Sequence, residues 1–225
     1  MNEENNRYSG MFTMLGMLFV TCLVVSNLIA GKIWSVYGTI SVQASVILFP
    51  ITYILSDVFT EVYGFKKARF IIWTGFACNL VAVLAYVITI ILPYPKYWLG
   101  QDAFGVVLGL TPRVLVASFA GYLFGEFANS IIMSKLKVKS EGKKLWVRII
   151  VSTLAGEAID TIIFVTVSFA GMIPVNQLIR MIHFQYTFKV LFEAVFMPVT
   201  YRIISRLKKK EGLDVIDHDI RYRLF

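Results

Sequence analysis

The chain has 225 residues, of which 57% belong to the hydrophobic set AVILMFWYC and only 16% are charged. Soluble domains typically have about 45–50% apolar and about 25% charged residues, so this composition indicates a membrane protein. It excludes the disordered, fibrous and disulfide-stapled secreted classes. The net charge of +8 is compatible with a nucleic-acid partner or with membrane topology, depending on where the basic residues lie.

Six apolar stretches are each long enough to cross the hydrocarbon core of a bilayer as a helix, which takes about 20 residues. Because lipid offers the backbone no hydrogen-bond partners, helices are expected. The short alternating segments of a transmembrane barrel do not occur in the sequence. We therefore predict an all-α integral membrane protein, a bundle of six helices at 11–34, 44–63, 70–92, 112–134, 147–171 and 181–205.

The basic residues predict the orientation of this bundle. Seventeen of the 22 lie on one side of the predicted spans and four on the other, while Lys189 lies within a span. Because basic residues favour the cytoplasmic side, we expect both termini in the cytoplasm and a multi-pass location in the cell membrane. The expected organisation is a cytoplasmic N-terminus (1–10), a six-helix transmembrane domain (11–205) and a basic cytoplasmic tail (206–225).

Topology therefore accounts for the basic excess, and we expect no direct nucleic-acid partner. The run Lys208–Lys210 is expected to face the anionic headgroups of the lipid bilayer.

Six carboxylates lie within the predicted spans, where each costs about 3 kcal/mol at mid-helix. Groups this costly are expected to face the bundle interior, and they form the candidate substrate-binding set together with one lysine and four amides. The candidates are Asn27, Asp57, Glu61, Asn79, Glu126, Asn129, Glu157, Asp160, Gln185, Lys189 and Glu193.

Several candidates also have a purely structural interpretation. Lys189 and Glu193 are four residues apart on one helix and are able to neutralise each other. Glu61 is able to pair with Lys66 and Lys67 at the membrane interface. Asn27 and Asn79 are also suited to hydrogen bonds between helices.

An internal similarity relates residues 123–133 to residues 154–164, with Leu, Gly, Glu and an Ile pair identical. The two copies cross the membrane in opposite directions, which resembles a small inverted repeat around a midplane site. We therefore expect Glu126 and Glu157 to lie at similar depth in a helical hairpin.

Small residues recur every fourth position at Ala117, Gly121 and Gly125. Such a face favours close packing of helices within the bundle, or docking of a second subunit.

The sequence contains no phosphate-binding loop, dinucleotide fingerprint or zinc-binding motif, so we expect no cofactor and no catalytic residues. One enzymatic alternative remains, an intramembrane enzyme that binds Mg²⁺ through carboxylates, because hard cations prefer oxygen ligands. Its ligands would be Asp57, Glu61, Glu157 and Asp160.

A group of short motifs resembles the queuosine precursor transporter family, which is related in fold to the vitamin-binding S components of energy-coupling-factor transporters. The most specific motif is Ser56-Asp57-x-x-Thr60-Glu61-x-Tyr63-Gly64, followed by Lys66, Lys67 and Arg69. The supporting motifs are Ser26-Asn27, Pro112-Arg113, Gly125-Glu126-x-x-Asn129-Ser130 and Gln185-Tyr186-x-x-Lys189-x-x-x-Glu193.

The resemblance implies import of a 7-deazaguanine, such as the 7-cyano or 7-aminomethyl compound or queuine, for salvage into tRNA. A guanine-like edge presents an N1–H and an exocyclic NH₂ side by side, which one carboxylate is able to accept together, and an amide or lysine suits the O6 acceptor. The candidates are Asp57, Glu126 or Asp160 for the carboxylate and Asn129, Gln185 or Lys189 for the carbonyl.

The main alternative is a passive binding subunit for another small planar molecule or vitamin. Such a subunit depends on an energising partner, as S components do. An energising subunit or a homo-oligomer therefore stays open as a partner.

Overall fold

The computed structural model describes residues 9–36, 40–109, 112–171 and 174–216, and within them the chain forms seven α-helices and one pair of short strands. The helices are α1 (Gly10–Ile29), α2 (Phe49–Val58), α3 (Phe65–Ile91), α4 (Gln101–Gly109), α5 (Pro112–Lys139), α6 (Leu145–Phe169) and α7 (Val175–Glu211). Two shorter helical segments flank α2, namely η2 (Ala44–Ile47) and the π-type turn η3 (Phe59–Tyr63). The strands β1 (Ile33–Val36) and β2 (Ile40–Gln43) pair antiparallel.

Within the described ranges, four segments are long and apolar enough to cross a membrane, and they match four of the predicted spans. They are Gly10–Ile29, Ala44–Tyr63, Phe65–Ile91 and Leu145–Phe169. The other two predicted spans fall on α5 and α7, which have 28 and 37 residues. The prediction of a helical protein with several membrane spans is therefore confirmed.

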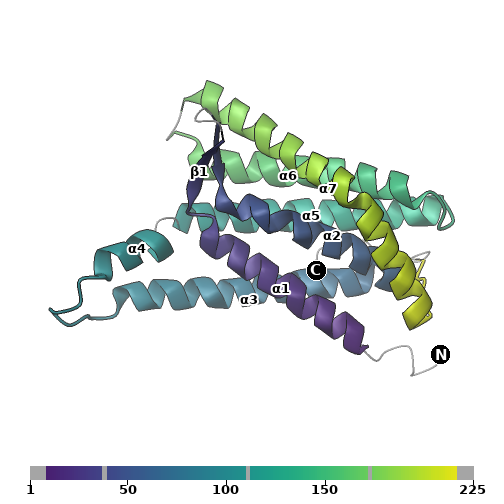
Figure 1. Cartoon of the computed structure of the whole chain (residues 1–225), viewed down its shortest axis with the longest axis horizontal. Helices are drawn as coiled ribbons and strands as arrows, with labels where there is room; N and C mark the ends of the chain where they lie inside the picture. The colour runs from purple at the N-terminus through teal and green to yellow at the C-terminus, as the bar shows by residue number, and fades with distance from the viewer. Residues whose placement is uncertain (1–8, 37–39, 110–111, 172–173, 217–225) are drawn as a thin grey trace.

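The helices run between two ends of an elongated bundle (Figure 1). The start of α1, the turn from η3 to α3, the α5–α6 connection and the end of α7 gather at one end, which we call the basic end. The strand pair, α4, the end of α6 and the start of α7 lie at the other, which we call the hairpin end.

The first predicted span is wrong at its C-terminal end. Ser9 caps α1 by accepting a hydrogen bond from the Phe12 N–H at 3.0 Å, but α1 ends at Ile29. The chain then turns into β1, which contains Trp34, and β1 pairs with β2. A four-residue apolar strand is too short to show a hydrophobic period that differs from that of the apolar helix before it. The sequence pattern therefore did not indicate the boundary between α1 and β1.

Helix α2 and the η3 turn that follows it, which together we call the α2 segment, form the centre of the bundle. Nearly all of their residues are buried. The α2 segment packs against α1, α5 and α7, which leaves none of its faces to lipid. The segment ends at Gly64, whose φ of 83° lies in the left-handed region that glycine adopts without strain. The polar side chains of α2 therefore face other helices, as a functional site in a membrane bundle requires.

Helices α5 and α6 form an antiparallel pair in which the backbones nearly touch. A Cβ added at Gly125 would lie 2.8 Å from the carbonyl oxygen of Gly156, and one added at Gly156 would lie 2.9 Å from that of Gly125. One added at Gly121 would lie 2.8 Å from the carbonyl oxygen of Asp160. The small-residue face of α5 therefore packs inside the bundle, and the docking interpretation of that face is wrong.

Candidate functional site

Two polar clusters occupy the interior of the bundle, and α2 with η3 contributes to both. The central cluster comprises Asp57, Glu126, Asn129, Thr153, Glu157, Asp160, Lys189 and Glu193. The Glu61 cluster, near the basic end, comprises Glu61, Lys137, Arg148, Lys208 and Asp214. Asp57 and Glu61 are only four residues apart in sequence, yet their partners are different.

Lys189 is the one cation of the central cluster, and it bridges α7 to α6. Its ammonium group lies 2.9 Å from Glu157 Oε2 and also pairs with Asp160. It sits 5.0 Å from the ring centre of Phe49, close enough for a cation–π contact. The expected neutralisation of Lys189 by Glu193 is therefore wrong, because both partners of Lys189 come from α6.

Glu193 and Asp57 form the side of the cluster away from Lys189. The Thr153 hydroxyl donates a hydrogen bond to Glu193, and Asn129 Nδ2 donates to Asp57 Oδ1 at 2.8 Å. Asp57 and Glu193 are electrostatic neighbours across the packed α2–α7 interface. Each carboxyl therefore has one neutral donor and an acidic neighbour.

Glu126 is completely buried, and among the described residues it has no cation partner and only the Ser56 hydroxyl as a hydrogen-bonding neighbour. It lies within electrostatic range of Glu157 and Asp57. The expectation that Glu126 and Glu157 approach each other in a hairpin is confirmed, because Gly125 and Gly156 mark the closest approach of α5 and α6.

A small cavity of about 20 Å³ opens beside Lys189. Its lining includes the polar residues Lys189, Asp160 and Gln43 and the aromatic residues Phe49 and Phe164. The remaining lining residues are Ser45 and Val46. A volume of this size holds about one water molecule, so the site is closed in this conformation.

A pair of glutamines borders this cavity. Gln185 Nε2 donates to Gln43 Oε1 at 2.7 Å, and Gln43 Nε2 donates to Gln185 Oε1 at 3.3 Å. These bonds tie β2 to α7 at the hairpin end. The sequence analysis included Gln185 among the candidate site residues but not Gln43. The one feature that could have indicated Gln43 is its position as an amide directly before an apolar span.

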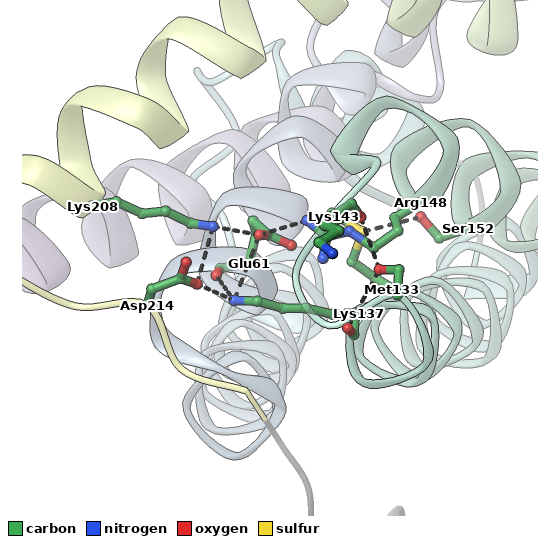
Figure 2. Close-up of polar contacts among 9 residues, drawn as sticks. Glu61, Met133, Lys137, Lys143, Arg148, Ser152, Lys208 and Asp214 are labelled. Atoms are coloured by element: carbon green, nitrogen blue, oxygen red, sulfur yellow. Dashed lines mark hydrogen bonds and ion pairs between the residues drawn. The ribbon is translucent and has the colours of Figure 1, made fainter.

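Glu61 lies outside the central cluster, surrounded by basic groups (Figure 2). Its Oε1 accepts hydrogen bonds from Arg148 at 2.8 Å and from Lys208 at 2.5 Å. Lys137 lies 3.5 Å from the same oxygen and donates to the Glu61 carbonyl at 2.5 Å. The expected pairing with Lys66 and Lys67 is therefore wrong, and buried basic residues from α5, α6 and α7 take that place.

Asp214 closes this cluster from the segment after α7. Lys137 donates to its Oδ1 at 2.6 Å, and Lys208 lies 3.0 Å away. Burial raises the pKa of Asp214, but the hydrogen bonds and charges of the two lysines outweigh it and hold the pKa below its usual value. From the sequence, Lys137 and Lys208 were interpreted only as signals of membrane topology. A count of charges on each side of the membrane does not indicate that these lysines pair with Glu61 and Asp214.

The remaining candidates lie on α1 and α3. Asn27 and Asn79 are both buried, and α1 packs against α3. Their role as substrate ligands or as hydrogen-bonding groups between helices stays a prediction.

The carboxylates proposed for Mg²⁺ are not assembled as one ligand set. Glu61 is held by Arg148 and Lys208, whereas Glu157 and Asp160 are held by Lys189. Within the described part of the chain, no group of three or more His, Cys, Asp or Glu side chains is arranged to hold a metal ion.

The central cluster falls within a region shared with known proteins. Residues 43–203 match a family described as "Putative vitamin uptake transporter". The chain is 25% identical to a "Probable queuosine precursor transporter" of Bacillus subtilis, over 85% of this chain and 82% of the relative. It is 24% identical to a "Queuosine precursor transporter" of Escherichia coli, over 94% of both chains. No solved structure matches the chain significantly.

Proposed function

Since the chain belongs to this family of vitamin uptake transporters, we propose that it imports a queuosine precursor, a 7-deazaguanine, through the central cluster. Family membership confirms that the chain is a membrane transporter of the cell membrane and not an enzyme. The substrate assignment is supported by the names of its relatives and by the chemistry of the cavity beside Lys189.

We place six spans in the membrane, with α5 and α7 joining the four most apolar segments. The basic end then faces the cytoplasm, together with residues 1–10 and 206–225, because basic residues favour that side. The gathering of the α5–α6 connection and the end of α7 at one end of the bundle supports this orientation (Figure 1).

The observation that carries the substrate proposal is the pairing of a carboxylate and an ammonium group in a cavity that two phenylalanines also line. The Asp160 carboxylate is suited to accept from the N1–H and NH₂ of a guanine-like edge, and the Lys189 ammonium to donate to O6. Phe49 and Phe164 offer faces for stacking on a planar ring. Of the three carboxylates considered for this contact, Asp160 is the one that lines the cavity.

The closed cavity requires an opening step before a deazaguanine is admitted. The Gln43–Gln185 pair is the natural place for that step, because two neutral hydrogen bonds hold β2 against α7 there. Neutral hydrogen bonds contribute only about 1 kcal/mol each, so their exchange for bonds to water or substrate costs little.

Uptake of labelled 7-cyano-7-deazaguanine by cells that express the protein tests the proposal. Asp160→Asn is expected to reduce uptake by about 100-fold or more, because the substituted amide presents a donor to the substrate's donors. The matched control is Asp102→Asn, an exposed carboxylate on α4, which is expected to leave uptake unchanged. Wild-type uptake by Asp57→Asn, Glu126→Gln and Asp160→Asn, all at equal expression, would contradict the proposal.

A further inference from the structure

Glu157 is a buried carboxylate for which the proposed substrate contacts provide no role. Its side chain is only 1% exposed, and it does not line the cavity beside Lys189, whereas Asp160, three residues further along α6, does. A buried charge is costly unless it is paired, so the partner of Glu157 indicates what this residue does.

The partner of Glu157 is the Lys189 ammonium group. Glu157 Oε2 lies 2.9 Å from Lys189 Nζ, and the lysine side chain is itself only 5% exposed. Because both groups are out of water, their attraction is far stronger than that of an ion pair on a surface. Glu157 therefore ties the ammonium group to α6 independently of Asp160.

Lys189 has Asp160 as its second partner, and the substrate needs the same carboxylate. Asp160 Oδ2 accepts a hydrogen bond from the lysine, and Asp160 also lines the cavity. In the proposed complex both oxygens of Asp160 accept from the N1–H and NH₂ of a guanine-like edge, so Oδ2 has to serve the lysine and the substrate at once. With Glu157 in place, Lys189 keeps a carboxylate partner that the substrate does not use.

Aromatic rings of α2 also limit where the ammonium group is able to move. Its nitrogen lies 5.0 Å from the ring centre of Phe49 and 5.7 Å from that of Tyr53. An ammonium group has three N–H donors, and one of them donates to Asp160. Held by α6 and by these rings, the lysine is able to direct another donor at a carbonyl oxygen in the cavity that it lines.

On the basis of the proposed transport function, we propose that Glu157 is a positioning residue that keeps the charged Lys189 ammonium group directed at the substrate carbonyl. Asp160 is then able to accept from the N–H groups of the substrate without leaving the lysine unpaired. Glu157 itself does not touch the substrate. The two carboxylates of α6 therefore have different roles, although they share one lysine.

The test measures binding of two ligands to the purified full chain at equal amounts of folded protein. The ligands are 7-cyano-7-deazaguanine and its 6-thio analogue, which keeps the N1–H and the 2-amino group but replaces the carbonyl oxygen with sulfur, a weaker acceptor. The ratio of their dissociation constants reports the contact between Lys189 and the carbonyl. The wild type is expected to bind the thio analogue about tenfold more weakly, as befits the loss of a hydrogen bond from a charged donor.

Glu157→Gln is expected to bind the deazaguanine about tenfold more weakly and to lose most of the discrimination, with a ratio below about three. The loss of discrimination is the decisive reading, because a residue that only stabilises the fold does not couple to one atom of the ligand. Should Glu157→Gln not fold, Glu157→Asp, which keeps the charge on a shorter side chain, is expected to give a ratio between these values.

The matched control is Glu126→Gln, at the position that aligns with Glu157 in the internal similarity. Glu126 is equally buried but has no cation partner among the described residues, so this variant is expected to keep the wild-type ratio. A wild-type ratio in the Glu157 variants would overturn the positioning role and leave the proposed function intact. Absence of deazaguanine binding by the wild type would overturn the proposed function together with this inference.

Discussion

The Glu61 cluster and the central cluster are both ionic and both buried, but their charges are unbalanced in opposite directions. Around Glu61, three basic side chains meet two carboxylates, and water reaches Lys208 and Asp214, whose side chains are 21% and 51% exposed. In the central cluster five carboxyl groups meet one lysine, and the Lys189 side chain is only 5% exposed. The first arrangement joins four segments of the chain, whereas the second is costly for stability alone and is better explained by binding and transport.

The largest effect on stability is expected from Glu61→Gln. This change leaves the nearly inaccessible Arg148 without its carboxylate, while Lys137 keeps only its pairing with Asp214. Removing one member of a buried ion pair typically costs about 3–5 kcal/mol, so thermal unfolding in detergent should occur at a clearly lower temperature.

The matched change in the central cluster is Glu126→Gln. Because Glu126 has no cation partner among the described residues, and a glutamine is still able to accept from the Ser56 hydroxyl, neutralising it should alter the free energy of unfolding by no more than about 0.5 kcal/mol. Equal destabilisation by both changes would remove the contrast between the clusters.

Lys189→Met is expected to have the next largest effect on stability and to abolish uptake. Its removal leaves Glu157 and Asp160 without a cation, and removing one member of a buried ion pair typically costs about 3–5 kcal/mol. Lys189→Arg keeps the charge and should retain part of the uptake. Normal uptake by the methionine variant would show that the lysine serves packing alone.

Gly125→Ala tests the close approach of α5 and α6, which brings the two copies of the internal similarity together. The new methyl group would lie 2.7 Å from Asp160 Cβ and 2.8 Å from a backbone oxygen, so a loss of about 1–3 kcal/mol is expected from overpacking. Gly105→Ala on α4 meets nothing within 4 Å and is the control, measured by the same thermal unfolding. Two indistinguishable midpoints would contradict the close approach.

Apart from the matched change Glu126→Gln, the smallest effect on stability should come from protonation of Asp214 at acid pH. Because Lys137 and Lys208 outweigh burial and hold the folded-state pKa below the ordinary value of 3.8, the contribution to stability is present above that pH. It is lost as the pH falls through the lowered pKa. The loss should stay below about 1 kcal/mol, since the side chain is half exposed and water screens the pair. Asp214→Asn should remove this part of the acid dependence in a pH series of unfolding curves, and an unchanged series would contradict the pairing.

Hydrophobic period and length predicted most of the fold, because both are local properties of the chain. The second predicted span, for example, matches Ala44–Tyr63 at both ends. The strand pair was missed because its apolar residues continue the pattern of α1. The position of buried carboxylates was predictable in the same way, since lipid makes them costly wherever they occur.

The partners of these carboxylates could not be predicted, because they come from distant parts of the chain. Arg148 and Lys208 are 87 and 147 residues from Glu61, and local spacing favoured Lys66 and Lys67 instead. The partners of Lys189 were also mispredicted. Helical spacing favoured Glu193, four residues further along the same helix, whereas the observed partners Glu157 and Asp160 lie on α6. Pairing across a bundle depends on which faces of the helices meet, and a single sequence does not contain that information.

Equilibrium binding to the purified protein tests the central claim most directly. The account predicts that the wild type binds 7-cyano-7-deazaguanine and rejects an adenine-like analogue that lacks the N1–H and the 2-amino group. Asp160→Asn, compared at equal amounts of folded protein, should bind at least about 100-fold more weakly, whereas Asp102→Asn should bind as the wild type does. Equal affinity of the wild type and Asp160→Asn for the deazaguanine would contradict the assignment of the central cluster as the substrate site.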